Sequence, residues 1–205
     1  MKILTNLYFI CFYFSSHAIL TSVSADVEKT LISWVIIEDR NIHAGSILTI
    51  QEGNEFDGIV FAEKMDDKWM AGSDNWKRSE NNQEKYPNWD AEVGSLVQVA
   101  IVYQKDLISI YRDGTLYASY AANNIDLLST QNDFAVFGKR HMGGGGGISG
   151  MIEDARIYTK ALTQSEIKGL IPNEVSEIEP YAWWNFEDDA SEQTGRFPHH
   201  ELRIG

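Results

Sequence analysis

The stretch that decides the fold is GMIEDARIYTKALTQSEIKGL, residues 150–170. Its first half alternates apolar and polar residues, as a half-buried strand does. Met151, Ala155 and Ile157 fall on one face of such a strand, because successive side chains point to opposite sides. Only Glu153 is out of place on that face. The first half therefore predicts a strand that packs one face against a core.

The second half predicts a short helix. Thr163 and Glu166 have the spacing of a capping box, in which each side chain binds the backbone N–H of the other residue. Leu162 and Ile167 are placed for the apolar contact that accompanies such a cap. Gly169 is placed as the C-terminal stop. A strand followed directly by a capped helix is a long and ordered pattern.

This strand and helix resemble the closing segment of laminin-G-like (concanavalin A-like) jelly-roll domains. The matching positions are Gly150, Ile152, Asp154, Arg156, Ile157, Tyr158, Ala161, Leu162, Glu166 and Ile167. Glu153 stands where the family has a first Asp. The resemblance implies an all-β fold, a two-sheet antiparallel jelly-roll sandwich with one short C-terminal helix. It implies less about function, because this sandwich hosts many functions.

The rest of the chain agrees with an all-β sandwich, since short alternating runs are separated by turn residues. The expected strands are Leu31–Ile37, Ser46–Gln51, Gly58–Glu63, Lys68–Gly72, Leu96–Tyr103, Leu107–Arg112, Thr115–Ala121, Phe134–Gly138 and Gly150–Tyr158. Asp113-Gly114 is a hairpin signal, because both residues tolerate the positive φ of a two-residue turn. The glycine run 143–147 is expected to be a floppy loop between the last two strands.

Residues 1–25 are interpreted as a cleavable export signal. Lys2 supplies a positive start, the run from Leu7 to Phe14 supplies an apolar core, and Ala25 ends a group of small residues. An uncleaved membrane anchor is the alternative, but the apolar run is well short of the ~20 residues that a span needs. We therefore expect a cut after Ala25 and a chain that is secreted, periplasmic or held at the cell surface.

Cysteine usage and charge limit the possible partners. Cys11, the one cysteine, lies in the expected signal, so the mature domain must be held together by its core without disulfides. The signal carries Lys2 and no acid, so its removal changes the net charge from −13 to −14. Such a surface repels phosphate backbones and anionic lipids. Nucleic acid and membrane-surface partners are therefore not expected, and neutral polysaccharide, calcium or a protein remains open.

Four segments are expected: the signal at 1–25, a laminin-G-like domain at 28–172, a linker at 173–180 and a further segment at 181–205. The run Tyr181–Asp188 resembles the opening strand of another laminin-G-like domain. It either folds back to complete the first sandwich or begins a second, truncated domain of a longer protein, and we favour the second hypothesis. Longer relatives of this kind carry glycoside hydrolase modules of the β-fructosidase type, so the resemblance implies such a neighbour.

A carbohydrate site is expected in the aromatic and polar segment that follows Trp69, itself assigned to the core. Aromatic rings stack on the apolar faces of sugars, and planar polar side chains bind their hydroxyl groups. The candidate residues are Asp74, Asn75, Trp76, Arg78, Tyr86 and Trp89. The alternative is that these aromatic side chains cap the open end of the sandwich.

Two further candidates involve carboxylates. Glu187, Asp189 and Glu192 match the Glu-x-Asp-x-x-Glu pattern of jelly-roll β-glucanases. Residues five apart on a regular strand point to opposite faces, however, whereas a retaining glycosidase needs its two carboxylates together on one side. We therefore expect a solvated acidic turn and assign no catalytic residue.

The family resemblance also implies one structural calcium ion, a cation that takes oxygen ligands. Asp154 matches the family's acid in the closing strand, with Glu187 or Asp188 as candidate partners. The alternative is an ion pair of Asp154 with Arg156 or Arg140. Asp154 is thus the one residue proposed from the sequence as a metal ligand.

The function expected from the sequence is that of a secreted, non-catalytic binding module. Its aromatic-rich loops would contact carbohydrate or a neighbouring domain. One alternative is a fragment of an exported glycoside hydrolase whose catalytic module lies outside residues 1–205. The other is a structural spacer without a ligand.

Overall fold

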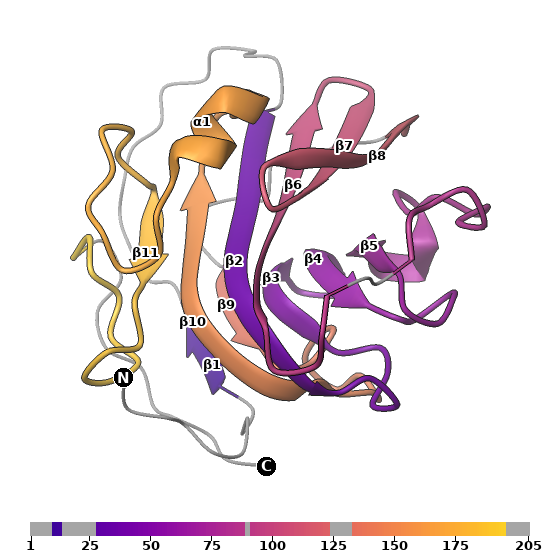
Figure 1. The fold of residues 1–205 in the computed structure, drawn as a ribbon, viewed down its shortest axis with the longest axis horizontal. Coiled ribbons are helices and arrows are strands. Elements are labelled where there is room, and N and C mark those ends of the chain that lie inside the picture. Colours follow the sequence, from indigo (N-terminus) through magenta and orange to yellow (C-terminus); the bar gives the residue numbers. More distant parts are fainter. Residues whose placement is uncertain (1–9, 14–27, 89–90, 124–132, 196–205) are drawn as a thin grey trace.

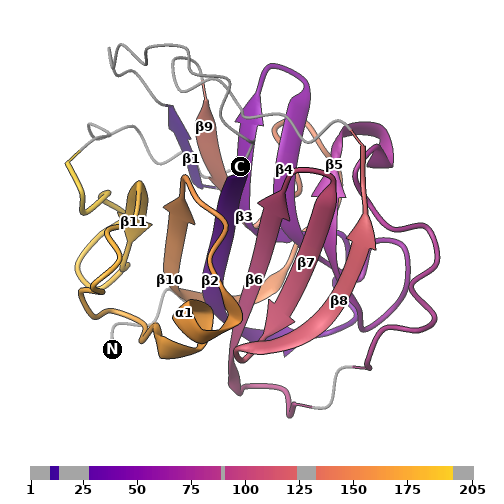
Figure 2. The ribbon, with the colours of Figure 1, turned by 90° about the horizontal axis from the view of Figure 1, so that it is seen from above.

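The structure is a computed structural model, and it describes residues 10–13, 28–88, 91–123 and 133–195. Two antiparallel sheets face each other across a common core (Figures 1 and 2). The five-stranded sheet has the order β1 (Ile10–Tyr13), β9 (Phe134–Phe137), β3 (Ser46–Glu52), β4 (Glu55–Phe61) and β5 (Trp69–Ser73). The six-stranded sheet has the order β11 (Ala182–Trp184), β10 (Ser149–Tyr158), β2 (Glu28–Asp39), β6 (Leu96–Gln104), β7 (Leu107–Arg112) and β8 (Thr115–Ala121). The expected jelly-roll sandwich is confirmed.

The core forms where the apolar faces of the two sheets meet. Val97, Val99 and Ile101 of β6 all lie in it, on the face predicted by their alternation. Trp69 is 1% exposed and contacts Phe61 with ring centroids 4.9 Å apart, so its assignment to the core is correct. The other face of β6 is also buried, by Ala100 and Val102. Both faces of this central strand are therefore covered.

The cover on the outer face is the helix α1 (Gln164–Gly169). The predicted capping box is present, since Thr163 N–H donates to Glu166 Oε2 at 2.6 Å and Thr163 Oγ1 accepts from Glu166 N–H at 3.3 Å. Leu162 and Ile167 are both buried in the apolar cluster below the helix. Gly169 is the last helical residue rather than the stop expected after the helix.

The closing strand β10 corrects one detail of the sequence pattern. A register shift against β2 lies between Ile152 and Asp154, so Glu153 is an extra residue in the strand. An extra residue moves the following side chains to the opposite face. Ile152 and Ala155 therefore both face the core, and Met151 does not, contrary to the prediction that Met151 and Ala155 share a face. This bulge explains why the polar Glu153 interrupts the alternation of the strand.

The turn between β7 and β8 forms where the sequence indicates it. The β7–β8 hairpin turns at Asp113 (φ 49°) and Gly114 (φ 67°), which confirms the predicted two-residue turn. Gly114 also lies so close to α1 that an added Cβ would be 2.7 Å from Lys168 Cβ. The turn thus determines how closely the hairpin approaches the helix.

Two of the edge strands, β11 and β1, bear on the organisation of the chain. β11 pairs with β10, and Trp184 is fully buried against Phe137 of the opposite sheet, with ring centroids 5.3 Å apart. Residues 182–184 thus take the fold-back arrangement. β1 comes from the segment interpreted as the export signal and pairs with β9. Cleavage after Ala25 stays a prediction, because that position lies outside the described residues.

Candidate functional site

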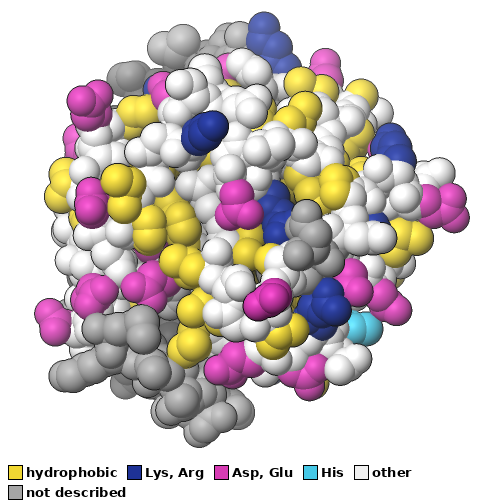
Figure 3. All heavy atoms as spheres, viewed as in Figure 1, with side chains coloured by type: hydrophobic (Ala, Val, Ile, Leu, Met, Phe, Trp, Pro, Cys, Tyr) yellow, Lys and Arg dark blue, Asp and Glu magenta, His cyan; other side chains and the backbone are white. Residues whose placement is uncertain are grey.

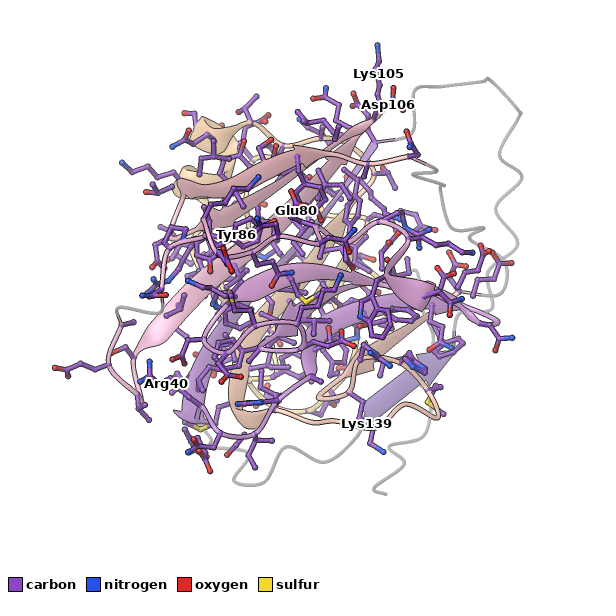
Figure 4. The ribbon with its side chains drawn as sticks, turned by 90° about the vertical axis from the view of Figure 1, so that its right-hand side faces the viewer. Arg40, Glu80, Tyr86, Lys105, Asp106 and Lys139 are labelled. Atoms are coloured by element: carbon purple, nitrogen blue, oxygen red, sulfur yellow. The ribbon has the colours of Figure 1, made fainter. Side chains whose placement is uncertain are left out.

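A pocket of about 390 Å³ opens between three loops at the end of the five-stranded sheet. The loops are the β3–β4 turn, the short 3₁₀ helix η1 (Asp74–Trp76) and the segment after β9. The lining residues are Asn54, Phe56, Ser73, Asp74, Asn75, Trp76, Arg140, His141 and Met142. Its volume is within the range of small-ligand sites. Figure 4 shows the side chain of Lys139, the residue before Arg140, pointing outward.

Trp76 supplies the exposed aromatic surface of the pocket. Its side chain is 47% exposed, and the Lys64 ammonium lies 5.7 Å from the ring centroid. Asn75 and Trp76 both have left-handed backbone angles, with φ of 49° and 54°. That conformation costs about 1–2 kcal/mol for a residue with a Cβ. Such strain persists only where the surroundings hold it, and it is frequent at ligand sites.

Asp74 holds the base of this strained segment. Its Oδ1 accepts from Arg78 Nη2 at 2.9 Å, and its Oδ2 accepts from Lys77 Nζ at 2.7 Å. Burial alone would raise the pKa of the Asp74 carboxyl, but the hydrogen bond from Lys77 and the charge of Arg78 outweigh burial and lower that pKa. Asp74 therefore lines the pocket as a charged carboxylate, and its two oxygens are already bound by Arg78 and Lys77.

Arg78 and Tyr86 lie elsewhere than a sugar-contacting role requires. Arg78 is 4% exposed and turns inward, where its Nε donates to Asp57 Oδ1 at 2.7 Å. Tyr86 is also 4% exposed and packs edge-to-face on Tyr117, with centroids 5.6 Å apart. Figure 4 shows Tyr86 with Glu80 in the loop that follows η1. Neither Arg78 nor Tyr86 lines the pocket. The alternative role, capping the end of the sandwich, fits Tyr86.

Trp89, the sixth predicted residue, lies outside the described residues. The structure thus brings Asp74, Asn75 and Trp76 together in one pocket. Asn75 and Trp76 are its most accessible members among the predicted set. Three of the six predicted residues therefore line one pocket, and their role in binding carbohydrate stays a prediction.

Other parts of the pocket wall come from residues that were not predicted for the carbohydrate site. His141 stacks on Phe56, with ring centroids 4.8 Å apart and planes 23° apart. His141 Nδ1 lies 2.8 Å from the Met142 carbonyl oxygen, which can only accept, so Nδ1 carries the proton. Nε2 is then free to accept from Arg140 Nη2 at 3.3 Å. Arg140 also forms an ion pair with Glu63. Phe56 is an apolar residue on β4, so its position in the sequence indicates the core and gives no sign of a site.

The glycine run beside this wall is packed in part, at Gly144, Gly146 and Gly147, where a loose loop was expected. Gly147 N–H donates to the His43 carbonyl at 3.1 Å. A Cβ added to Gly45 would lie 2.2 Å from the Gly147 carbonyl carbon. A Cβ added to Gly144 would lie 2.8 Å from His141 Nε2. Glycine is therefore needed here for close approach of two backbones, and that approach places the loop that carries His141.

Asp154, the proposed metal ligand, is fully buried in an ion pair with Arg156. Its Oδ2 also accepts from the Asn173 backbone N–H at 2.7 Å and from Trp183 Nε1 at 2.9 Å. Calcium requires oxygen ligands, whereas Asp154 is surrounded by N–H donors. The surroundings of Asp154 do not fit the ion and favour the ion-pair alternative. Across the described ranges, no group of three or more His, Cys, Asp or Glu side chains is arranged for a metal.

The acidic pattern near the C-terminus serves the turn that contains it. Asp189 Oδ1 accepts from the Ser191 backbone at 2.7 Å, and Glu192 Oε1 accepts from the Trp183 backbone at 2.8 Å. Glu187 accepts from Asn173 Nδ2 at 2.8 Å. These carboxylates thus bind local donors.

Elsewhere, Asp and Glu side chains are scattered over the face seen in Figure 3. No helix within the described part of the chain is long and apolar enough to cross a membrane.

Comparison with known proteins agrees with this fold. A model of the concanavalin A-like lectin/glucanases superfamily matches residues 14–168, which is more than half of the chain. No curated protein sequence matches the chain.

Three solved structures illustrate the likeness. Domain 4 of AbnA, a GH43 extracellular arabinanase from Geobacillus stearothermophilus solved with arabinotriose, is 19% identical with a TM-score of 0.52, over 70% of this chain and 66% of that one. The SAP-like pentraxin of Limulus polyphemus is 15% identical with a TM-score of 0.53, over 82% and 76%. A candidate carbohydrate-binding protein from Bacteroides ovatus is 14% identical with a TM-score of 0.60, over 93% and 57%. At these identities the likeness concerns the fold.

Proposed function

The chain belongs to the concanavalin A-like lectin/glucanase superfamily, and from that premise we propose that it is a non-catalytic carbohydrate-binding module. The observation that carries this proposal is the half-exposed indole of Trp76 in a pocket rich in amide and charged groups. An aromatic face next to planar polar side chains matches a sugar ring, which has apolar C–H faces and a rim of hydroxyl groups.

The arrangement of the pocket supports a division of labour. The Trp76 ring offers the stacking surface. Asn54 and Asn75, both exposed at the rim, offer amide donors and acceptors for hydroxyl groups. The stacked pair of Phe56 and His141 lines the same pocket. Asp74, which also lines the pocket, is held by Arg78 and Lys77, which supports the placement of the neighbouring Asn75 and Trp76.

The test is a titration of sugars against the chain while tryptophan fluorescence is recorded. The probes are arabinotriose, the ligand in the related arabinanase domain, together with fructan and β-glucan oligosaccharides and sialyllactose. We expect at least one probe to change the fluorescence with saturation. We expect Trp76→Ala to weaken that binding at least tenfold, since the loss of one stacking ring removes the main apolar contact.

Leu116→Ala is the control, because Leu116 is similarly exposed, at 50%, but lies on β8 away from the pocket. The Leu116→Ala variant should bind the sugar with the same affinity as the unaltered chain. If no probe binds, the carbohydrate proposal is wrong and the spacer alternative gains. If a probe binds and Trp76→Ala binds it equally well, the pocket is the wrong site.

We also propose that the chain is exported and works beside a glycoside hydrolase module. The features behind this are the apolar N-terminal segment and the family resemblance. Mass analysis of the exported product should show an N-terminus at Asp26. Reading the coding sequence beyond Gly205 shows whether a hydrolase module follows in frame. A product that begins at Met1 would contradict export by cleavage.

A further inference from the structure

A line of buried charges leads from the opposite sheet to the pocket. Asp57, on β4, is 1% exposed and lies between the sheets. Its Oδ2 accepts from Lys29 Nζ of β2 at 2.5 Å, and its Oδ1 accepts from Arg78 Nε at 2.7 Å. Arg78 Nη2 continues the line by donating to Asp74 Oδ1 at 2.9 Å. Four charged side chains therefore connect β2 with the wall of the pocket.

Arg78 is well suited to transmit position along this line. Its planar guanidinium group binds Asp57 through Nε, while Nη2 binds Asp74 and the Phe56 carbonyl, the latter at 2.9 Å. The fork geometry fixes these partners relative to one another. Its backbone is also held, because Arg78 N–H donates to Ser73 Oγ at 2.9 Å. The orientation of Asp74 thus follows from the orientation of Arg78.

The strained segment lies directly beyond Asp74. Asn75 and Trp76 keep positive φ angles while the Asp74 carbonyl accepts from Lys77 N–H and the Trp76 carbonyl accepts from Ser79 N–H, both at 3.1 Å. A segment that is unfavourable by itself relaxes when its supports are removed. The supports here are Asp74 and Arg78, and the support of Arg78 is Asp57.

Stability alone does not explain this arrangement. A buried ion pair is weak evidence for stability, because removing charges from water offsets much of their attraction. The same region also contains the fully buried Tyr103, whose ring lies 4.9 Å from the Lys29 ammonium. An apolar cluster would fill such a space without the desolvation penalty. The distinguishing property of the charged line is the fixed geometry that it imposes on η1.

We propose that Asp57 is a positioning residue of the pocket: through Arg78 and Asp74 it holds Asn75 and Trp76 in the conformation that binds the sugar. Asp57 does not line the pocket. The inference rests on the proposed carbohydrate binding for its affinity readout. It has a second readout, the order of η1, that does not need a ligand.

The test compares Asp57→Asn with Asp154→Asn. Both replace a fully buried carboxylate that is paired with a buried arginine, but Asp154 lies on β10 and has no contact with the pocket. We expect both variants to melt earlier than the unaltered chain. We expect Asp57→Asn to raise the Kd of the best-binding probe at least tenfold, and Asp154→Asn to change it less than twofold.

Hydrogen exchange supplies the second readout. In Asp57→Asn the amides of Lys77 and Ser79 should exchange at least tenfold faster, and in Asp154→Asn they should not. If Asp57→Asn does not fold, Arg78→Lys replaces it. Lysine keeps the charge, but its single nitrogen lacks the fork by which Arg78 binds Asp57 through Nε and Asp74 through Nη2. The expected changes in Kd and in exchange are the same.

The outcomes separate the two proposals. If the unaltered chain binds none of the sugars, the proposed function fails and exchange at Lys77 and Ser79 decides the inference. Unchanged exchange in Asp57→Asn, or in Arg78→Lys if that variant is used, overturns the inference. So does an equal loss of affinity in Asp57→Asn and Asp154→Asn, because the effect would then be general destabilisation.

Discussion

Arg156 donates to both carboxylate oxygens of Asp154, from Nε to Oδ1 at 3.0 Å and from Nη2 to Oδ2 at 2.7 Å. The guanidinium group lies between the rings of Trp34 and Trp183, at 5.3 and 4.8 Å from their centroids. Nη2 also donates to the carbonyls of Ile171 and Glu174, both at 2.9 Å. This buried pair therefore ties the segment between α1 and β11 to the six-stranded sheet.

Breaking this pair on one side should be severe. Arg156→Met leaves the Asp154 charge buried without its cation, and we expect a loss of about 3–5 kcal/mol in the free energy of unfolding. Adding Asp154→Leu to that variant should recover part of the loss, since no uncompensated charge then remains. Urea denaturation measures both. A double variant no more stable than Arg156→Met would show that the backbone contacts of Arg156 matter more than its charge.

Asp133 should make stability depend on pH. It is 3% exposed, its Oδ1 has no hydrogen-bond partner among the described residues, and burial, with the nearby charge of Glu52, raises its pKa from 3.8 to about 7. Between these values the folded chain keeps a proton that the unfolded chain releases. The contribution of Asp133 to the free energy of unfolding therefore falls as the pH rises from about 4 to 7.

Asp133→Asn should remove this dependence. Three pKa units correspond to about 4 kcal/mol as an upper limit, so the variant should gain stability relative to the unaltered chain at pH 8 and lose that gain towards pH 4. Thermal melts at several pH values measure it. Asp106→Asn, at the exposed β6–β7 turn in Figure 4, controls for the loss of an acid. A gain that is constant across pH would contradict the burial of a protonated Asp133.

The same substitution should change the stability of the chain differently at Gly45 and at Gly145. Gly45→Ala would place a Cβ 2.2–2.4 Å from the backbone of Gly147 and Ile148, so the two segments must separate there. We expect a loss of at least about 2 kcal/mol and weaker sugar binding, because the His141 wall would shift. Gly145→Ala meets no atom within 4 Å and should be neutral or slightly stabilising. Equal effects of the two would show that the loop is not packed as described.

Trp184 tests whether β11 belongs to this sandwich. Trp184→Ala should cost about 3–5 kcal/mol, because a fully buried indole leaves a cavity against Phe137 and Ala155. Val175→Ala is the control, since Val175 is 87% exposed in the preceding segment. Chemical denaturation compares the two with the unaltered chain. A Trp184→Ala variant as stable as the control would return 181–205 to the hypothesis of a separate domain.

Much of the fold was predictable from local patterns. The nine expected strands are present with small shifts at their ends, and the capping box and the Asp113-Gly114 turn are where the residues indicate. Such features depend on neighbours a few residues away, so they are visible along the chain. The bulge at Glu153 was missed because a single extra residue is recognised only against a partner strand, here β2.

The candidate site was predictable only in part. Asn75 and Trp76 stand out as an aromatic and polar pair in a loop, and both line the pocket. Phe56 and His141 are 85 residues apart in sequence and meet only in space. Arg78 resembles the exposed Lys77 beside it in sequence, and its inward turn depends on a carboxylate 21 residues earlier. No local pattern contains that information.

By itself the order of residues determined that this chain makes two antiparallel layers with a capped helix and carries an excess of negative charge. Alternation, turn chemistry and charge are local properties, and each acts over a few residues. The tertiary structure alone decided three further outcomes. Residues 182–184 join the first sandwich, Asp154 pairs with Arg156, and Trp76 and His141 line the same pocket. Those outcomes depend on which buried groups find partners across the sheets, because an unpaired charge or polar group in the core is too unfavourable to persist.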